Sequence, residues 1–272
     1  MSDLKQQEKD NNISTTSTIQ WVGLRICVLQ PDYSTSAVDY QHYDPVRNLS
    51  HLIPEALIDH VLINKLTTYR QLKDLKKKNY HIFVNLCEGY LEWEVPSIDV
   101  IYTLELLKLP FTGPTSLLYD PPKELMKYVA YTANVLTPAY TLIEDENTVE
   151  LNCKHLRYPL FVKPHKAGDS LGIDDRSMVH NPAELCKKIK EIIDEYSPLL
   201  VEEYVDGREF TVMIAATSDP KKPITFKPVE YIFPEGKKFK TYSLKTTELH
   251  PNANVPVTDE NIDQQLRAAR LF

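Results

Sequence analysis

The stretch that decides the fold is YPLFVKPHKAGDSLGI, residues 158–173. Its apolar first half predicts a strand that ends at Lys163, and the loop that follows contains Gly168, Ser170 and Gly172. Such a loop places backbone N–H groups and a hydroxyl around a point where a lysine also projects, which suits a phosphate. A plain turn that needs a positive φ at glycine explains the loop about equally well. The common motifs G-x-x-x-x-G-K-[ST] and G-x-G-x-x-G are absent here.

A second stretch, LLVEEYVDGREFTVMI at residues 199–214, follows about 30 residues later. Successive side chains of a strand point to opposite faces, so one of Glu202 and Glu203 can face a cleft while the other meets solvent. The two apolar halves of the stretch are expected to pair as antiparallel strands around Asp206-Gly207. A charged edge of a hairpin is the alternative explanation for these acids.

Strands and helices alternate before residue 119. Apolar runs at 24–29, 56–63 and 81–86 predict buried strands, and the segments 69–78 and 97–108 predict amphipathic helices. The alternation predicts a parallel α/β sheet built from β-α-β units.

The next part of the chain continues with mixed elements. We expect a helix at about 122–133, strands at 140–143 and 160–163 around a polar insertion at 144–157, and an amphipathic helix at 182–193.

Composition and charge narrow the function classes. The chain has 272 residues, of which 42% are hydrophobic and 25% charged, as in ordinary globular proteins. A net charge of -7 argues against nucleic acid as a partner. No apolar run is long enough for a membrane helix, and residues 1–20 lack the apolar core of a secretory signal. We therefore expect no membrane partner, a cytoplasmic location and a disordered tail at residues 1–20.

The cysteines and histidines give no sign of a metal site. The four cysteines lie far apart without a C-x-x-C pair, and the eight histidines are scattered singly. Free thiols are expected, and no residue is assigned to a metal.

Four motifs together resemble one known superfamily. The stretches 158–173 and 199–214, with VNLCEG at 84–89 and LPFTG at 109–113, resemble the ATP-grasp superfamily, and within it the D-alanine–D-alanine ligase-like proteins. The motifs occur in the family's order, and the resemblance covers about residues 22–272.

The resemblance implies a fold and its division. It implies an α/β protein with α+β grasp lobes, an ATP-grasp fold preceded by a Rossmann-like pre-ATP-grasp domain. The expected parts are the pre-ATP-grasp domain at 21–118, a central lobe at 119–198 and an incomplete carboxy-terminal lobe at 199–272. The family's magnesium ligands, an Asp and a Glu-x-Asn segment, lie on strands after the helix that here ends in RAARLF, residues 267–272, and no such strands follow in this sequence.

The resemblance also implies a reaction. Such ligases join a carboxylate to an amine through an acyl phosphate, use ATP and Mg²⁺, take small-molecule substrates and often form homodimers. We expect a carboxylate–amine ligase of this type, either active or truncated and inactive. The alternatives are a non-catalytic ATP-binding or scaffold protein, and an ATP-grasp kinase that would share the nucleotide residues.

Residue by residue, the resemblance assigns a nucleotide site and a catalytic lysine. Asp169 stands where the family usually has serine, and residues 30–36 replace a glycine-rich segment that grips D-alanine, so the substrate is expected to differ from D-alanine. For Lys123, at the start of a helix, a solvated lysine is the alternative. The assigned residues are Lys123, Lys163, Gly168 and Ser170 for the phosphates, Glu202 for the adenine amino group, Glu203, Tyr204 and Val205 for the hinge along the adenine edge, Glu209 for the ribose, and Lys245 as the catalytic residue.

Overall fold

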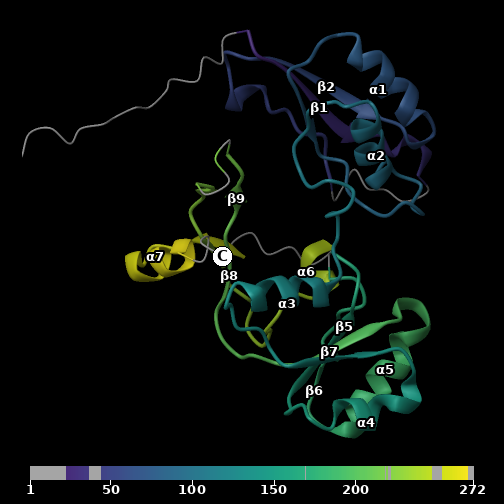
Figure 1. Ribbon diagram of the computed structural model, residues 1–272, viewed down its shortest axis with the longest axis vertical. Coiled ribbons are helices and arrows are strands. Elements are labelled where there is room, and N and C mark those ends of the chain that lie inside the picture. The colour runs from purple at the N-terminus through teal and green to yellow at the C-terminus, as the bar shows by residue number, and fades with distance from the viewer. Residues whose placement is uncertain are drawn as a thin grey trace, which may run out of the picture. The chain divides into compact units, whose positions relative to one another are not determined.

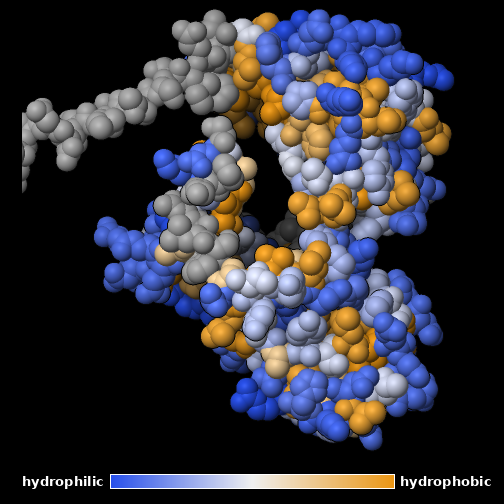
Figure 2. All heavy atoms as spheres, in the orientation of Figure 1, coloured by the Kyte–Doolittle hydropathy of each residue, from blue (hydrophilic) through white to orange (hydrophobic). Residues whose placement is uncertain are grey.

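The computed structural model (Figure 1) contains two compact units, Met1–Tyr119 and Asp120–Phe272. The predicted tail at residues 1–20 lies outside the described residues, and the predicted lobe boundaries stay predictions. On the face shown in Figure 2, hydrophilic and hydrophobic side chains are interspersed in each unit, as is usual for globular proteins. The described residues are 23–36, 44–168, 170–217, 219, 222–246 and 253–268.

The first unit is built on a parallel sheet. Strand β1 (Arg25–Pro31) lies between β2 (Leu57–Ile63) and β3 (Ile82–Asn85), and both neighbours run parallel to it. Phe83 forms a further parallel bridge to Phe111. The parallel α/β sheet predicted from the alternating pattern is confirmed.

Two helices complete the core of this unit. Helix α1 (Thr68–Lys76) buries Leu72 and Leu75, and α2 (Ile98–Leu106) buries Val100, Ile101 and Leu104 at helical spacing. Leu72, Leu75, Val100 and Leu104 pack with residues of the sheet into one apolar cluster, which is why the periodic segments form helices here. Short 3-10 turns lie at Tyr33–Thr35, Ser50–Leu52 and Lys65–Thr67.

The second unit contains a four-stranded antiparallel sheet. Its order is β4 (Tyr140–Ile143), β7 (Leu199–Glu203), β5 (Leu160–Pro164) and β6 (Met178–Val179). Strand β7 is therefore a central strand, hydrogen-bonded to β4 on one side and to β5 on the other.

The predicted hairpin around Asp206-Gly207 is wrong. Strand β8 (Glu209–Thr211) pairs with β11 (Val229–Tyr231) and not with β7. The apolar residues that begin β7 are completely buried, and its backbone is hydrogen-bonded on both sides as a central strand of the four-stranded sheet. Residues 204–208 connect two different sheets.

Helices cover one face of the four-stranded sheet (Figure 1). Helix α5 (Pro182–Tyr196) begins with an Asn181 cap, whose side chain accepts the Glu184 N–H at 3.0 Å. The segment 144–157 is predicted to be a polar insertion, but the structure has helix α4 (Val149–Cys153) there, preceded by a 3-10 turn at Glu146–Thr148. Val149 and Cys153 are buried in the core, which the many polar neighbours of this segment concealed.

The remaining elements of the second unit are short. Helix α3 (Lys123–Thr132) precedes the four-stranded sheet in the chain. A three-stranded antiparallel sheet has the order β12 (Asn254–Pro256), β11 and β8, and a separate pair consists of β9 (Ile214–Ala215) and β10 (Ile224–Thr225). The last helices are α6 (Tyr242–Thr246) and α7 (Glu260–Ala268). Among the helices described here, none is long and apolar enough to cross a membrane.

Candidate functional site

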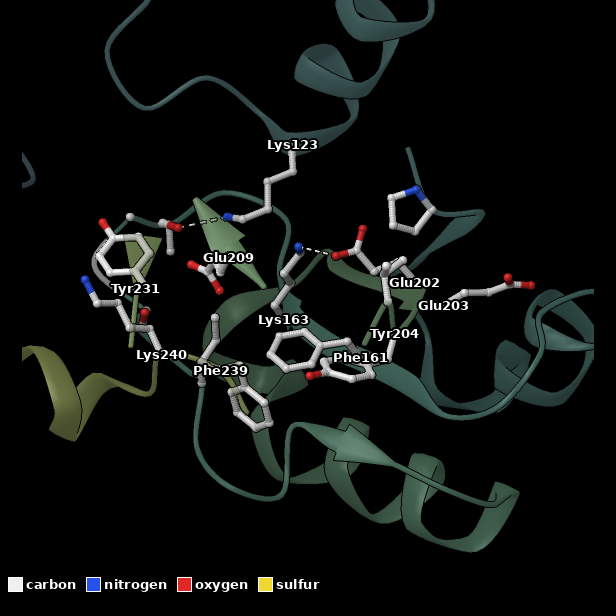
Figure 3. A pocket seen from close by; sticks show the side chains of 16 residues that line it. Lys123, Phe161, Lys163, Glu202, Glu203, Tyr204, Glu209, Tyr231, Phe239 and Lys240 are labelled. Atoms are coloured by element: carbon white, nitrogen blue, oxygen red, sulfur yellow. Dashed lines mark hydrogen bonds and ion pairs between the residues drawn. The ribbon is translucent and has the colours of Figure 1, made fainter. Parts of the chain in front are cut away.

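A cavity of about 540 Å³ lies in the second unit (Figure 3). All the residues that the resemblance assigned to the nucleotide line this cavity. They come from the strands β5, β7 and β8, the start of α3 and the segments that follow β5 and β7. The binding roles of these residues stay predictions, but the structure brings their side chains or backbone to one place. Lys245 belongs to α6, and its side chain lies outside the described part of the chain. The lining residues from the assignment are Lys123, Lys163, Gly168, Ser170, Glu202, Glu203, Tyr204, Val205 and Glu209.

The two-residue period of β5 and β7 separates the cavity from the core. Leu160 and Val162 of β5 belong to the core cluster under α5, whereas Phe161 and Lys163 line the cavity. The same alternation in β7 turns the Glu202 side chain toward Lys163.

Glu203 shows the other half of this alternation. Its side chain points away from Lys163 and forms an ion pair with Arg157, with 2.9 Å between Oε2 and Nη2 (Figure 3). Hydrogen bonds from Arg157 lower the pKa of the Glu203 carboxyl. Since Glu203 also appears in the cavity lining, its contribution there fits the backbone of a hinge better than a charged side chain.

The carboxylate of Glu202 is held by two lysines. Lys163 Nζ forms an ion pair with Oε1, and Lys127 Nζ lies 2.7 Å from Oε2. Lys127 also donates to the carbonyl oxygen of Pro138 at 3.0 Å and lies 5.0 Å from the centre of the Tyr140 ring. The sequence analysis missed Lys127, although it follows Lys123 by four residues, the spacing of neighbours on one helix face.

Lys123 fastens the start of α3 to the loop after β5. Its Nζ donates to the carbonyl oxygen of Ala167 at 2.8 Å. Its backbone N–H donates to the carbonyl oxygen of His165 at 3.1 Å. Burial, followed by the positive charge of Lys163, lowers the pKa of Lys123. A partly buried lysine held in this way differs from the solvated helix-start lysine considered as the alternative.

The loop after β5 combines a tight backbone with residues that line the cavity. Gly172 has φ +71°, and a Cβ there would come within 2.8 Å of the Pro164 ring, so this position requires glycine. Ser170 also has a positive φ, of 60°. The turn explanation therefore holds at Gly172, while Gly168 and Ser170 line the cavity. Asp169 lies outside the described residues.

Aromatic side chains form an apolar wall of the cavity. The ring of Phe161 lies 4.9 Å from that of Phe239, edge to face, and 6.2 Å from that of Tyr204. Lys240 Nζ lies 3.6 Å from the centre of the Tyr231 ring. The sequence analysis missed Phe239. A flat aromatic ligand fits such a wall.

The residues that the structure describes form no cluster of metal ligands. They contain no group of three or more His, Cys, Asp or Glu side chains that could hold a metal. Asp259 accepts the N–H groups of Asn261 and Ile262 at 2.9 and 3.1 Å and so caps α7. The described residues therefore offer no such set of ligands for a magnesium ion.

The fold and the site together define a class of protein. Two antiparallel sheets that contribute lysines and carboxylates to one cavity, in a chain with a parallel α/β unit before them, have the architecture of ATP-grasp enzymes. The D-alanine–D-alanine ligase from Bacillus anthracis, whose structure was solved in complex with ATP, has the same fold with a TM-score of 0.62 at 18% identity. That match covers 92% of this chain and 76% of the ligase.

Sequence comparison narrows the class to a family. The family described as D-ala D-ala ligase C-terminus matches residues 128–270, more than half of the chain, and the protein belongs to this family. An uncharacterized protein y4sG of Sinorhizobium fredii is 31% identical over 167 residues, which cover 59% of this chain and 46% of the relative. The D-alanine–D-alanine ligase B of Clostridium tetani is 27% identical over 221 residues, 75% of this chain and 59% of the relative. The chain thus spans about half the length of these curated relatives.

Proposed function

We propose that the cavity of the second unit binds ATP. The observation that carries this proposal is the meeting of Lys123, Lys163, Glu202 and Glu209, from separate elements, around one cavity beside an aromatic wall. Membership in the ligase family and the ATP complex of the Bacillus anthracis relative support it.

Each group of residues has a task that its chemistry suits. The adenine ring would lie against the wall that contains Phe161 and Phe239, with its amino group donating to Glu202 and its edge along the hinge backbone of Glu203, Tyr204 and Val205. Glu209 would accept from the ribose hydroxyls. The ammonium groups of Lys123 and Lys163, with Gly168 and Ser170, would neutralise the phosphates.

For the reaction, we propose ATP-dependent ligation of a small-molecule carboxylate to an amine through an acyl phosphate. ATP would supply the phosphoryl group that activates the carboxylate, with Mg²⁺ as the family's second cofactor and Lys245 near the transferred group. A second candidate is ATP binding without catalysis, which is favoured by the lack of a carboxylate cluster among the described residues. No observation favours the kinase, and the homodimer stays a prediction.

A titration tests the binding proposal. ATP binding is measured by calorimetry, with and without Mg²⁺, for the wild type, Lys163→Met, Glu209→Gln and the control Lys190→Met, an exposed lysine of α5. Loss of a charged hydrogen-bond partner should weaken binding by about 1 to 3 kcal/mol in the two site variants and leave the control unchanged. Wild-type affinity in both site variants would contradict the assignment.

ADP release then separates the two candidate functions. Release that depends on both a carboxylate and an amine supports ligation, whereas ATP binding without such release supports the non-catalytic alternative. The assay offers amino acids and small peptides in pairs, because the acceptor is not defined by the nucleotide residues.

A further inference from the structure

Glu202 is a nearly buried carboxylate with both of its oxygens occupied by lysines. Its exposed fraction is 9%, Lys163 contacts Oε1, and Lys127 contacts Oε2. A buried charge of this kind is tolerated because cations and hydrogen bonds compensate it. Two ammonium groups thus serve one carboxylate in the structure.

The two lysines differ in how firmly they are held beside Glu202. Lys163 lines the cavity, and its side chain is 20% exposed, twice the 10% of Lys127. Lys127 does not line the cavity, and its Nζ is also held by the carbonyl oxygen of Pro138. Lys127 Nζ also lies over the ring of Tyr140, and Tyr140 of β4 is the direct partner of Glu202 in β7. Lys127 is therefore held against the same pair of strands that carries the carboxylate.

We infer that Lys127 is a positioning residue that sets the selectivity for the base, an inference that rests on the proposed ATP function. When Lys163 turns to the phosphates, Oε1 of Glu202 becomes free, and Lys127 remains as the counter-ion on Oε2. The charged carboxylate then presents an acceptor to the base. An ionised carboxylate only accepts, so it pairs with the 6-amino group of adenine and repels the 6-oxo group of hypoxanthine or guanine.

The loss of Lys127 should remove this selectivity. Lys163 then stays on Glu202 as its remaining counter-ion and blocks Oε1, while the ammonium group of Lys163 can donate to a 6-oxo group. ATP binding is therefore weakened more than the binding of a 6-oxopurine nucleotide. A purely structural role for Lys127 would instead weaken both nucleotides equally.

The test compares ATP with inosine 5′-triphosphate, which carries an oxo group in place of the 6-amino group. Both dissociation constants are measured by calorimetry for the wild type, Lys127→Met, Lys127→Arg and the exposed-lysine control Lys190→Met, after thermal melts of each variant. The wild type should prefer ATP by about tenfold or more, the scale of one hydrogen bond to a charged group. Lys127→Met should reduce the preference to less than about threefold, whereas Lys127→Arg, which keeps the cation, and Lys190→Met should retain it.

The outcomes separate this inference from the proposed function. Equal weakening of ATP and inosine triphosphate in Lys127→Met, or an unchanged preference, would overturn the inference. Equal affinity of the wild type for the two nucleotides would also overturn it while leaving nucleotide binding intact. A wild type that binds neither nucleotide would contradict the proposed function itself. If Lys127→Met does not fold, Lys127→Gln, which keeps an N–H donor without the charge, carries the same expectation.

Discussion

Replacing Asp99 with asparagine should destabilise the first unit by about 2 to 3 kcal/mol, the scale for losing hydrogen bonds to a charged group. Asp99 accepts from Lys65 Nζ at 2.7 Å, from the Ser97 N–H at 2.8 Å and from the Thr68 hydroxyl at 3.1 Å. The Asp99 and Lys65 side chains are only 18% and 16% exposed. An asparagine keeps one acceptor oxygen but leaves the lysine charge without its partner.

The pH dependence of this effect has a definite sign. Burial alone would raise the pKa of Asp99, but hydrogen bonds from Lys65 and Ser97 and the lysine charge together lower it below the ordinary value. A carboxyl with a lower pKa in the folded state stabilises that state above its unfolded pKa, near 3.9, and the contribution is lost as the pH falls through the folded pKa. The difference between wild type and Asp99→Asn should therefore be constant from about pH 5 to 8 and shrink below about pH 4.

Tryptophan fluorescence during urea unfolding provides the assay. The two tryptophans of the sequence are Trp21 and Trp93. Trp93 lies in the described part of the first unit, where its ring is 5.2 Å from that of Tyr90, so a change in its emission reports the unfolding of this unit. The matched control is Asp74→Asn, which removes an exposed ion pair with Lys77 and should leave the midpoint unchanged. A loss no larger for Asp99→Asn than for the control, or a difference that persists undiminished at pH 3, would refute the reasoning.

Two further predictions concern the core and the thiols. Removing residues 199–272 takes away β7, the strand between β4 and β5, so the product should aggregate in size-exclusion chromatography; a soluble fragment that melts cooperatively would contradict this role of β7. Iodoacetamide at pH 8 should label Cys186 first in the folded protein, because burial raises the pKa of Cys27 to about 12 and that of Cys153 to about 11. Mass spectrometry that finds Cys27 labelled as fast as Cys186 would show that the core opens readily.

Local patterns predicted most of the elements because their causes are local. The apolar periods at 24–29 and 182–193 each belong to one strand or helix, and both elements form where the period indicates. The position of β7 depends on partners far away in the chain, which a short window around Asp206-Gly207 does not contain. The residues around Asp206-Gly207 are equally compatible with a hairpin. In the structure, the apolar run that begins β7 is instead buried between β4 and β5.

The candidate site shows the same division between local and distant information. The loop glycines and the acids of 199–214 were recognisable from residue type and spacing. Lys127 and Phe239 acquire their places only when α3 and the segment after β11 fold beside β7. For Lys127, the four-residue spacing from Lys123 was the available signal, and the carboxylate that it meets is 75 residues away in the sequence.

Photoaffinity labelling with 8-azidoadenosine 5′-triphosphate tests the central claim, nucleotide binding in this cavity, most directly. The full-length protein is irradiated with the probe, digested and analysed by mass spectrometry, with and without excess ATP. The label should appear on the peptides that contain Tyr204 or Phe239, and ATP should suppress it. ATP-suppressible label confined to peptides of the first unit, or label on the cavity peptides that ATP leaves unchanged, would contradict the account.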